Sequence, residues 1–212
     1  MASALIHIAI AKEVNKKLKR KENIYLLGSI APDISKFVGH TKKRSHFMEN
    51  GHNEPNIDYF LSKYSKYLDD DFVIGYYIHL LVDYFWFKDF IPKFIDEEND
   101  TIKTLNGEII NVNHNKIIEY IYNNYSSLNN EIIKAYNLDL NILNQPIPYI
   151  KPIINELPSY DLKILTDKIL DIIKNDNIKD NYIFDLSIID RFIADSVENI
   201  TQNLKELKYL DQ

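Results

Sequence analysis

The segment 75–87 constrains the fold of this chain more than any other feature. Its residues read Gly-Tyr-Tyr-Ile-His-Leu-Leu-Val-Asp-Tyr-Phe-Trp-Phe, and it lies inside a stretch, 70–94, that we expect to form one long buried helix. A helix that is apolar on every side has to be covered on every side, which requires several further elements around it. His79 and Asp83 interrupt the apolar pattern four residues apart, so they share one face of that helix. A buried ionised carboxylate is costly unless it is paired or binds a metal.

The remainder of the chain shows the same helical character. Five glycines and seven prolines punctuate 212 residues, and apolar residues recur at helical spacing. We predict an all-α fold, a multi-helix bundle around a buried His/Asp metal cluster. We expect a single domain, 1–212, in which residues 1–95 form the metal-site region and residues 96–212 complete the bundle. The helices are expected at residues 3–20, 55–68, 70–94, 113–125, 129–136, 160–174 and 183–207.

Two segments interrupt the expected helices. The pair Asn106-Gly107 stands between two short β-prone runs, which predicts a short β-hairpin near residues 102–112. Four prolines predict a non-helical connector at residues 144–158.

Composition and charge exclude several classes of function. The chain has no cysteine, which excludes thiolate metal sites, disulfide scaffolds and cysteine nucleophiles. The net charge of −6 gives no general attraction to nucleic acid, so no nucleic-acid partner is expected. No apolar run approaches the ~18–20 residues that span a membrane. Near the N-terminus the positive charges follow the apolar residues, whereas in a signal peptide they precede them. We therefore expect a cytoplasmic protein without a transmembrane segment.

Three further residues in the first quarter of the chain are candidate metal ligands. His7 has mostly small neighbours on its helical face, which leave room for a ligand, although a single histidine in an apolar helix is also a common hydrogen-bonded core residue. Asp33 ends the motif Gly28-Ser-Ile-Ala-Pro-Asp33, in which glycine permits a tight turn and proline fixes the backbone; its alternative role is a helix cap. His46 lies in the basic segment 42–47, where the alternative is an exposed loop histidine.

Together with His79 and Asp83, these residues make a set of three histidines and two aspartates. The His79–Asp83 pair by itself is also compatible with a hydrogen bond that only fixes a helix. Gly75, one turn before His79, is expected to leave space beside the imidazole. Imidazole nitrogens and carboxylate oxygens suit zinc, and also iron, manganese or nickel. Such donors can hold one or two divalent ions with a bridging carboxylate, and a site of this kind activates water and clamps a phosphoryl group.

These motifs resemble those of the zinc-dependent phospholipase C family. Members have an early histidine in the first helix, a Gly-x-x-x-Pro-Asp loop, a histidine in the next segment and a Gly-x-x-x-His-x-x-x-Asp helix. The corresponding residues here, in the same order and within about residues 1–95, are His7, Gly28 through Asp33, His46, and Gly75 through Asp83. The resemblance implies an α-helical bundle around a metal cluster. It also implies three ligands, His46, His79 and Asp83. By the same resemblance His7 binds a neighbouring ion, and Asp33 is a ligand or the general base beside the attacking water.

The chain departs from the secreted members of that family in two places. It begins Met-Ala-Ser, whereas they have a processed N-terminal tryptophan whose amine binds metal. They also carry a further histidine shortly after the helix aspartate and a later His-x-x-x-Glu pair. Here Asp89 stands six residues after Asp83, as a candidate substitute ligand.

The favoured hypothesis is a metal-dependent hydrolase of phosphoesters, with Asp33 as the catalytic residue. Its substrate would be a small phosphoester or a phospholipid headgroup. A second hypothesis is a non-catalytic, metal-binding helical protein, a degenerate member of the family, and the missing later ligands favour it. A third is an interaction or scaffold protein without a metal.

Overall fold

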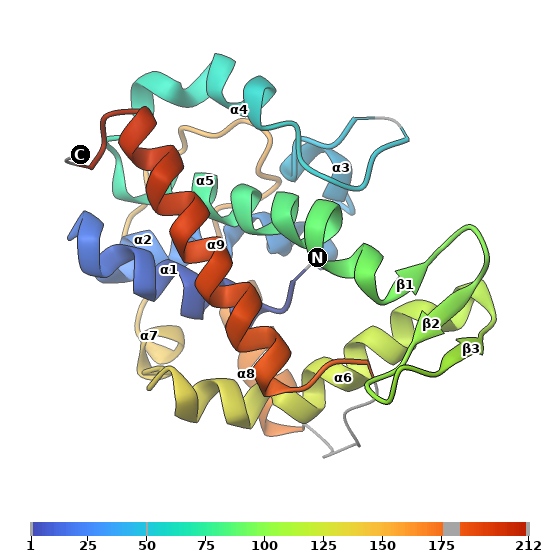
Figure 1. The fold of residues 1–212 in the computed structure, drawn as a ribbon. Helices are drawn as coiled ribbons and strands as arrows, with labels where there is room; N and C mark the ends of the chain where they lie inside the picture. The colour runs from blue at the N-terminus through green and yellow to red at the C-terminus, as the bar shows by residue number, and fades with distance from the viewer. Residues whose placement is uncertain (1, 50, 176–182, 211–212) are drawn as a thin grey trace.

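Helices account for most of the fold (Figure 1). The computed structural model describes residues 2–49, 51–175 and 183–210. The α-helices are α1 (Ala4–Leu18), α2 (Glu22–Gly28), α3 (Lys42–Ser45), α4 (Ile57–Tyr64), α5 (Asp71–Phe85), α6 (His114–Ala135), α7 (Asn141–Asn144), α8 (Lys163–Lys174) and α9 (Leu186–Glu206). The tighter 3-10 turns are η1 (Ala31–Lys36), η2 (Ser65–Tyr67) and η4 (Ile91–Lys93), and η3 (Trp86–Phe90) is a π-helical turn. The predicted helical bundle is confirmed.

A small antiparallel sheet projects from one end of the bundle (Figure 1). Its strands β1 (Ile95–Asp96), β2 (Thr101–Lys103) and β3 (Ile109–Asn111) lie in the order β1-β2-β3. Strands β2 and β3 confirm the hairpin predicted near residues 102–112, and β1 adds a third strand to it. Residues 145–158, within the proline-rich connector, contain no helix or strand.

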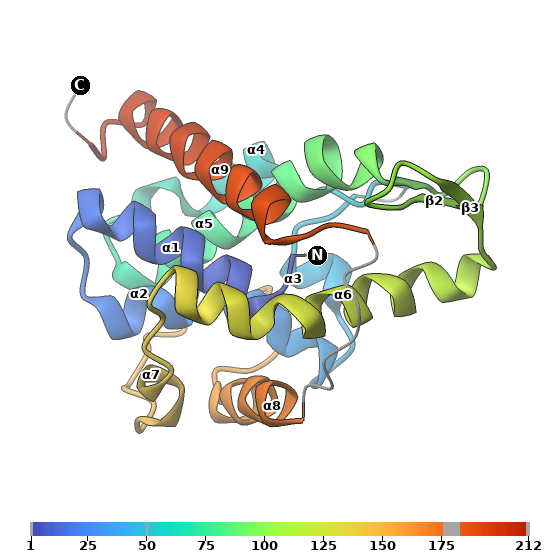
Figure 2. The same ribbon diagram turned by 60° about the horizontal axis from the view of Figure 1, so that its bottom comes forward.

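Helix α5 runs through the interior, and the other helices cover it (Figures 1 and 2). Every residue from Phe72 to Asp83 is buried. Helices α1 and α2 pack against α5, α9 crosses over both α1 and α5, and α8 lies on the opposite side of the molecule, beside η1 and α6. This surrounding layer explains why α5 is apolar on all of its faces. Within the described part of the chain, none of the helices combines the length and the apolarity needed to cross a membrane.

Two glycines let α2 and α5 touch backbone to backbone. A β-carbon added at Gly75 would lie 2.1 Å from the carbonyl oxygen of Tyr25, and Gly28 makes the reciprocal approach. The expectation that Gly75 leaves space beside the imidazole is therefore wrong, because that space holds the backbone of α2. The close approach also brings the carbonyl group of Ser29, directly after α2, into contact with His79.

We expect Gly75→Ala to destabilise the protein. In a helix without such a contact, replacing glycine with alanine stabilises the folded protein by about 0.5–1 kcal/mol. Here the added methyl group has to push two backbones apart, and overpacking of a core typically costs about 1–3 kcal/mol. Urea denaturation should show the free energy of unfolding reduced by at least about that amount, and Gly28→Ala should behave alike. A free energy of unfolding that rises in both variants would contradict the contact.

Several helices differ from their sequence predictions. The single helix expected at residues 70–94 is wrong in extent, because α5 ends at Phe85 and the turns η3 and η4 follow it. The segments 113–125 and 129–136 are wrong as separate helices, because α6 is continuous through both. Within the expected break, the Ser127 hydroxyl donates to the Asn123 carbonyl oxygen at 3.1 Å, and Leu128 is buried against the core. Because the serine hydroxyl finds its hydrogen-bond partner within the helix, it does not interrupt α6, and the packing of the apolar face keeps the helix continuous. The short helices α2, α3 and α7 were not predicted; α2, for example, has only seven residues and no side-chain cap, so the sequence gives no signal for it.

Candidate metal centre

Five polar side chains from four separate elements meet in the interior of the bundle. They are His7 from α1, Asp33 from η1, His46 directly after α3, and His79 and Asp83 from α5. Asp33 keeps 2% of its surface exposed, and the other four are fully buried. Polar groups in such an interior are costly unless partners satisfy them.

Backbone carbonyl groups fix the protonation of two of the imidazoles. His79 Nδ1 lies 2.8 Å from the carbonyl oxygen of Ser29. His46 Nδ1 lies 3.1 Å from the carbonyl oxygen of Lys42 and 2.9 Å from Ser45 Oγ. Because a carbonyl oxygen can only accept a hydrogen bond, each Nδ1 carries the proton and each Nε2 presents a lone pair. An imidazole held in this way by its other nitrogen is the usual form of a metal-binding histidine.

The two unprotonated nitrogens face each other and two carboxylate groups. His46 Nε2 and His79 Nε2 lie 3.3 Å apart. Asp33 Oδ1 is 3.4 Å from His46 Nε2, and Asp83 Oδ2 is 3.7 Å from the same atom and 3.6 Å from His79 Nε2. Neither oxygen has a hydrogen-bond partner among the described residues. His46 Nε2, His79 Nε2 and Asp83 Oδ2 thus face one another with no donor among them, with Asp33 Oδ1 beside His46 Nε2, and a cation among these atoms would satisfy them.

The spacing of three of these atoms, His46 Nε2, His79 Nε2 and Asp83 Oδ2, fits a zinc ion. Ligands about 2.0–2.1 Å from zinc, at the corners of a tetrahedron, lie about 3.3 Å from one another. The contacts given above span 3.3 Å to 3.7 Å. Two imidazole nitrogens and two carboxylate oxygens suit zinc, and also iron or manganese. The buried His/Asp cluster therefore fits metal binding.

His7 makes a second group beside the first. Its Nε2 lies 3.4 Å from Asp83 Oδ1, and its ring stacks on that of His79 with the centroids 3.9 Å apart. Neither ring nitrogen of His7 has a hydrogen-bond partner in the described structure, which is unusual for a buried polar group. The backbone N–H of Ala2 donates to the same oxygen of Asp83 at 3.1 Å. One oxygen of Asp83 therefore faces each group, as in a bridging carboxylate.

Burial and neighbouring charges hold these side chains in their metal-binding forms. Burial lowers the pKa of His7 to about 4 and also lowers the pKa of His46. Burial alone would raise the pKa of Asp33, but the Lys36 ammonium, 2.9 Å from its Oδ2, holds that pKa well below the usual range. The neighbouring histidines outweigh burial in the same way and lower the pKa of Asp83. At neutral pH the imidazoles of His7 and His46 are therefore neutral. The carboxylates of Asp33 and Asp83 are ionised, as metal binding requires.

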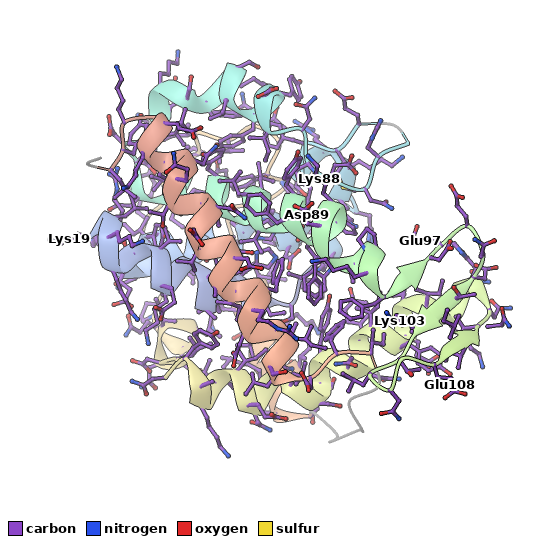
Figure 3. The ribbon with its side chains drawn as sticks, in the orientation of Figure 1. Lys19, Lys88, Asp89, Glu97, Lys103 and Glu108 are labelled. Carbon is purple, nitrogen blue, oxygen red and sulfur yellow. The ribbon has the colours of Figure 1, made fainter. Side chains whose placement is uncertain are left out.

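The other candidates lie away from this cluster. Asp89, considered as a substitute ligand and labelled in Figure 3, is exposed on η3. Among the described residues, the groups that could hold a metal ion do not include it. His52 and His114 are exposed and lie beside acidic side chains, Glu54 and Asp100 respectively.

Sequence reasoning missed the residues that position the ligands. Lys36 holds one oxygen of Asp33, and Ser45 Oγ contacts the ring of His46. The hydroxyl group of Tyr76 donates to the backbone carbonyl of Ser45. For Lys36 a weak signal exists, because it stands three residues after Asp33, a spacing at which opposite charges meet in helical turns.

The fold and the cluster define an all-α protein with a buried His/Asp site suited to a metal ion. The family model described as zinc dependent phospholipase C matches residues 4–144, more than half of the chain. The chain belongs to this family. The match includes all five residues of the cluster and continues through α6 to the end of α7, beyond the residues on which the resemblance was recognised. Searches among curated proteins and among solved structures gave no match.

Proposed function

We propose that this protein is a metal-dependent hydrolase of lipid phosphoesters and that zinc is its metal. One observation carries most of the proposal: the unprotonated nitrogens of His46 and His79 lie 3.3 Å apart and face two unpartnered carboxylate oxygens. Such an arrangement is unfavourable in a buried site unless a cation lies within it. Membership of the zinc-dependent phospholipase C family supplies the reaction class.

In this proposal one or two ions bind. His46, His79 and Asp83 hold the first, with Asp33 as a fourth ligand or as the group that positions water. His7 and the second oxygen of Asp83 hold the other. We also infer a single domain, in which the first 95 residues supply the ligands and the later helices close the bundle around them.

Asp33 is the proposed catalytic residue because it lies between the cluster and a cavity. The cavity has a volume of about 480 Å³, and Asp33 and Lys36 both line it together with residues of α6 and α8. The other four residues of the cluster are fully buried. A substrate in the cavity would therefore meet Asp33 first.

A bound metal ion would act as a Lewis acid toward the phosphoryl group and lower the pKa of water. Asp33 Oδ1, on the cluster side, would orient the attacking water and accept its proton. Lys36 holds Oδ2 of the same carboxylate, which fixes its orientation and favours its ionised form at neutral pH. The backbone carbonyl groups behind His46 and His79 keep both imidazoles turned toward the cluster.

A second candidate function is metal binding without catalysis. The complete burial of four cluster residues favours it, because structural metal sites are closed whereas catalytic sites keep one position open. The two functions use the same ligands and differ only in turnover.

A hydrolysis assay separates the two. Metal-replete protein would be offered aryl phosphodiesters and monoesters, and then phosphatidylcholine. We expect turnover that stops when a chelator removes the metal and returns when zinc is added. Metal-replete protein that hydrolyses none of these compounds would favour the non-catalytic binder.

A further inference from the structure

Ser45 lies where three ligand-bearing elements meet. It is the last residue of α3, directly before His46, and it is fully buried. Asp33 belongs to η1, and His79 and Asp83 belong to α5. The ligands proposed for the first ion thus come from three separate parts of the chain. Their geometry depends on what holds these parts together.

The hydroxyl group of Ser45 links His46 to the segment that carries Asp33. Ser45 Oγ lies 2.9 Å from His46 Nδ1, which carries a proton and therefore donates. The same oxygen lies 3.1 Å from the carbonyl oxygen of Pro32 and 2.9 Å from Ser35 Oγ. Ser35 Oγ in turn donates to the Pro32 carbonyl oxygen at 2.9 Å. The single hydrogen of the Ser45 hydroxyl group can therefore reach Pro32 either directly or through Ser35.

The carbonyl group of Pro32 belongs to the peptide unit that contains the nitrogen of Asp33. Two hydroxyl groups converge on it, so the backbone that carries Asp33 is held from the side of α3. Only the longest contact of Ser45 Oγ, 3.2 Å to the carbonyl oxygen of Lys42, stays within α3 itself. Asp33 Oδ1 and His46 Nε2 lie 3.4 Å apart at the cluster, and the serine connects the same two residues from behind.

The backbone of Ser45 is bound to the third element. The phenol hydroxyl group of Tyr76, on α5, donates to the carbonyl oxygen of Ser45. Tyr76 is fully buried and lies three residues before His79, which makes the two side chains neighbours on the helix. Burial raises the pKa of Tyr76 well above its ordinary value, so the hydroxyl group keeps its proton and remains a donor.

We propose that Ser45 is a positioning residue of the metal centre, whose hydroxyl group holds His46 against the segment of Asp33 and whose carbonyl group ties both to α5. The inference rests on the proposed function, since it concerns the ligands of the first ion. Ser45 itself touches neither ion nor substrate. Its replacement leaves every ligand in the chain but releases those of η1 and α3 from those of α5.

The zinc affinity of Ser45→Ala, measured by competition with a chromophoric chelator, tests this inference. Groups that support a metal ligand are typically worth about 10- to 100-fold in affinity, and we expect a loss of that size. Thr166→Val is the control. The Thr166 hydroxyl group is equally buried but donates within the last third of the chain, to the carbonyl oxygen of Lys163 on the same helix. This variant should bind zinc as tightly as the wild type.

A second pair of variants covers the case in which Ser45→Ala does not fold. Tyr76→Phe and Tyr25→Phe each remove a buried phenol hydroxyl group that donates to a backbone carbonyl group, and the acceptor of Tyr25 is Ala11 on α1. We expect Tyr76→Phe alone to lose about tenfold in zinc affinity. Thermal unfolding of the metal-free proteins should show a similar loss of stability in both variants.

Cobalt substitution separates positioning from stability. The visible spectrum of bound Co²⁺ reports the coordination geometry, so it should change in Ser45→Ala and Tyr76→Phe and stay as in the wild type in Thr166→Val and Tyr25→Phe. Unchanged zinc affinity and spectrum in the first two variants, or equal losses in the controls, would overturn the proposal.

The outcome is separable from the proposed function. A wild-type protein that binds zinc but hydrolyses no phosphoester would overturn the catalysis and leave the role of Ser45 to be decided by the variants. A wild-type protein that binds neither zinc nor cobalt would overturn both. Hydrolysis by the wild type, with full zinc affinity in Ser45→Ala and Tyr76→Phe, would overturn this inference alone.

Discussion

Replacing His79 or Asp83 with alanine should leave the purified protein with little bound metal. Each variant removes a donor that faces the shared point between two imidazoles and two carboxylates. Loss of a residue that merely supports a ligand typically costs 10- to 100-fold in metal affinity, and the loss of a ligand should cost at least about as much. Elemental analysis after dialysis against a weak chelator would measure the effect, with circular dichroism to verify that the variants are folded.

Two other histidines provide the control. His52 and His114 are exposed, so His52→Ala and His114→Ala should retain the metal content of the wild type. Asp83→Asn, which keeps the shape of the side chain, covers the case in which Asp83→Ala does not fold. Equal metal content in all of these variants would mean that the ligands have been assigned wrongly.

Asp33→Asn should abolish most of the hydrolysis while the fold and much of the metal remain. Asparagine keeps an oxygen toward the cluster but cannot accept a proton from water, and general-base catalysis is typically worth about 10²–10⁴-fold. The substitution also removes the charge that pairs with Lys36. Steady-state kinetics on the best phosphoester substrate should show a decrease in kcat of that size.

Asp89→Asn is the matched control for this prediction. Asp89 is exposed on η3 and lies away from the cluster, so the same chemical change there should alter neither kcat nor metal content. A decrease in kcat for Asp89→Asn as large as that for Asp33→Asn would show that Asp89 belongs to the site. Full activity of Asp33→Asn would remove Asp33 from the catalytic role.

The ligand-bearing helix was predictable because its signal is local. His79 and Asp83 lie four residues apart in an apolar helix, and that spacing alone places them on one face. His46 was different: no periodicity marks it, and only the order of motifs in a known family pointed to it. The structure buries it completely and joins it to the cluster.

The supporting contacts were not predictable, because they depend on how helices pack. The carbonyl group of Ser29 reaches His79 only because Gly28 and Gly75 let two helices touch. The cavity depends on α6 and α8, which follow the cluster residues by many positions in the chain. A pattern of spacings predicts which face of a helix is buried, but not which element will cover it.

Elemental analysis of the wild-type protein tests the central claim most directly. The protein would be purified without chelator and without an affinity tag of histidines. We predict one or two divalent transition-metal ions per chain, with zinc the most abundant, because the lone pairs and carboxylates of the cluster need a cation. A protein that is isolated without metal, and that takes up none when zinc, iron or manganese is offered, would contradict the account.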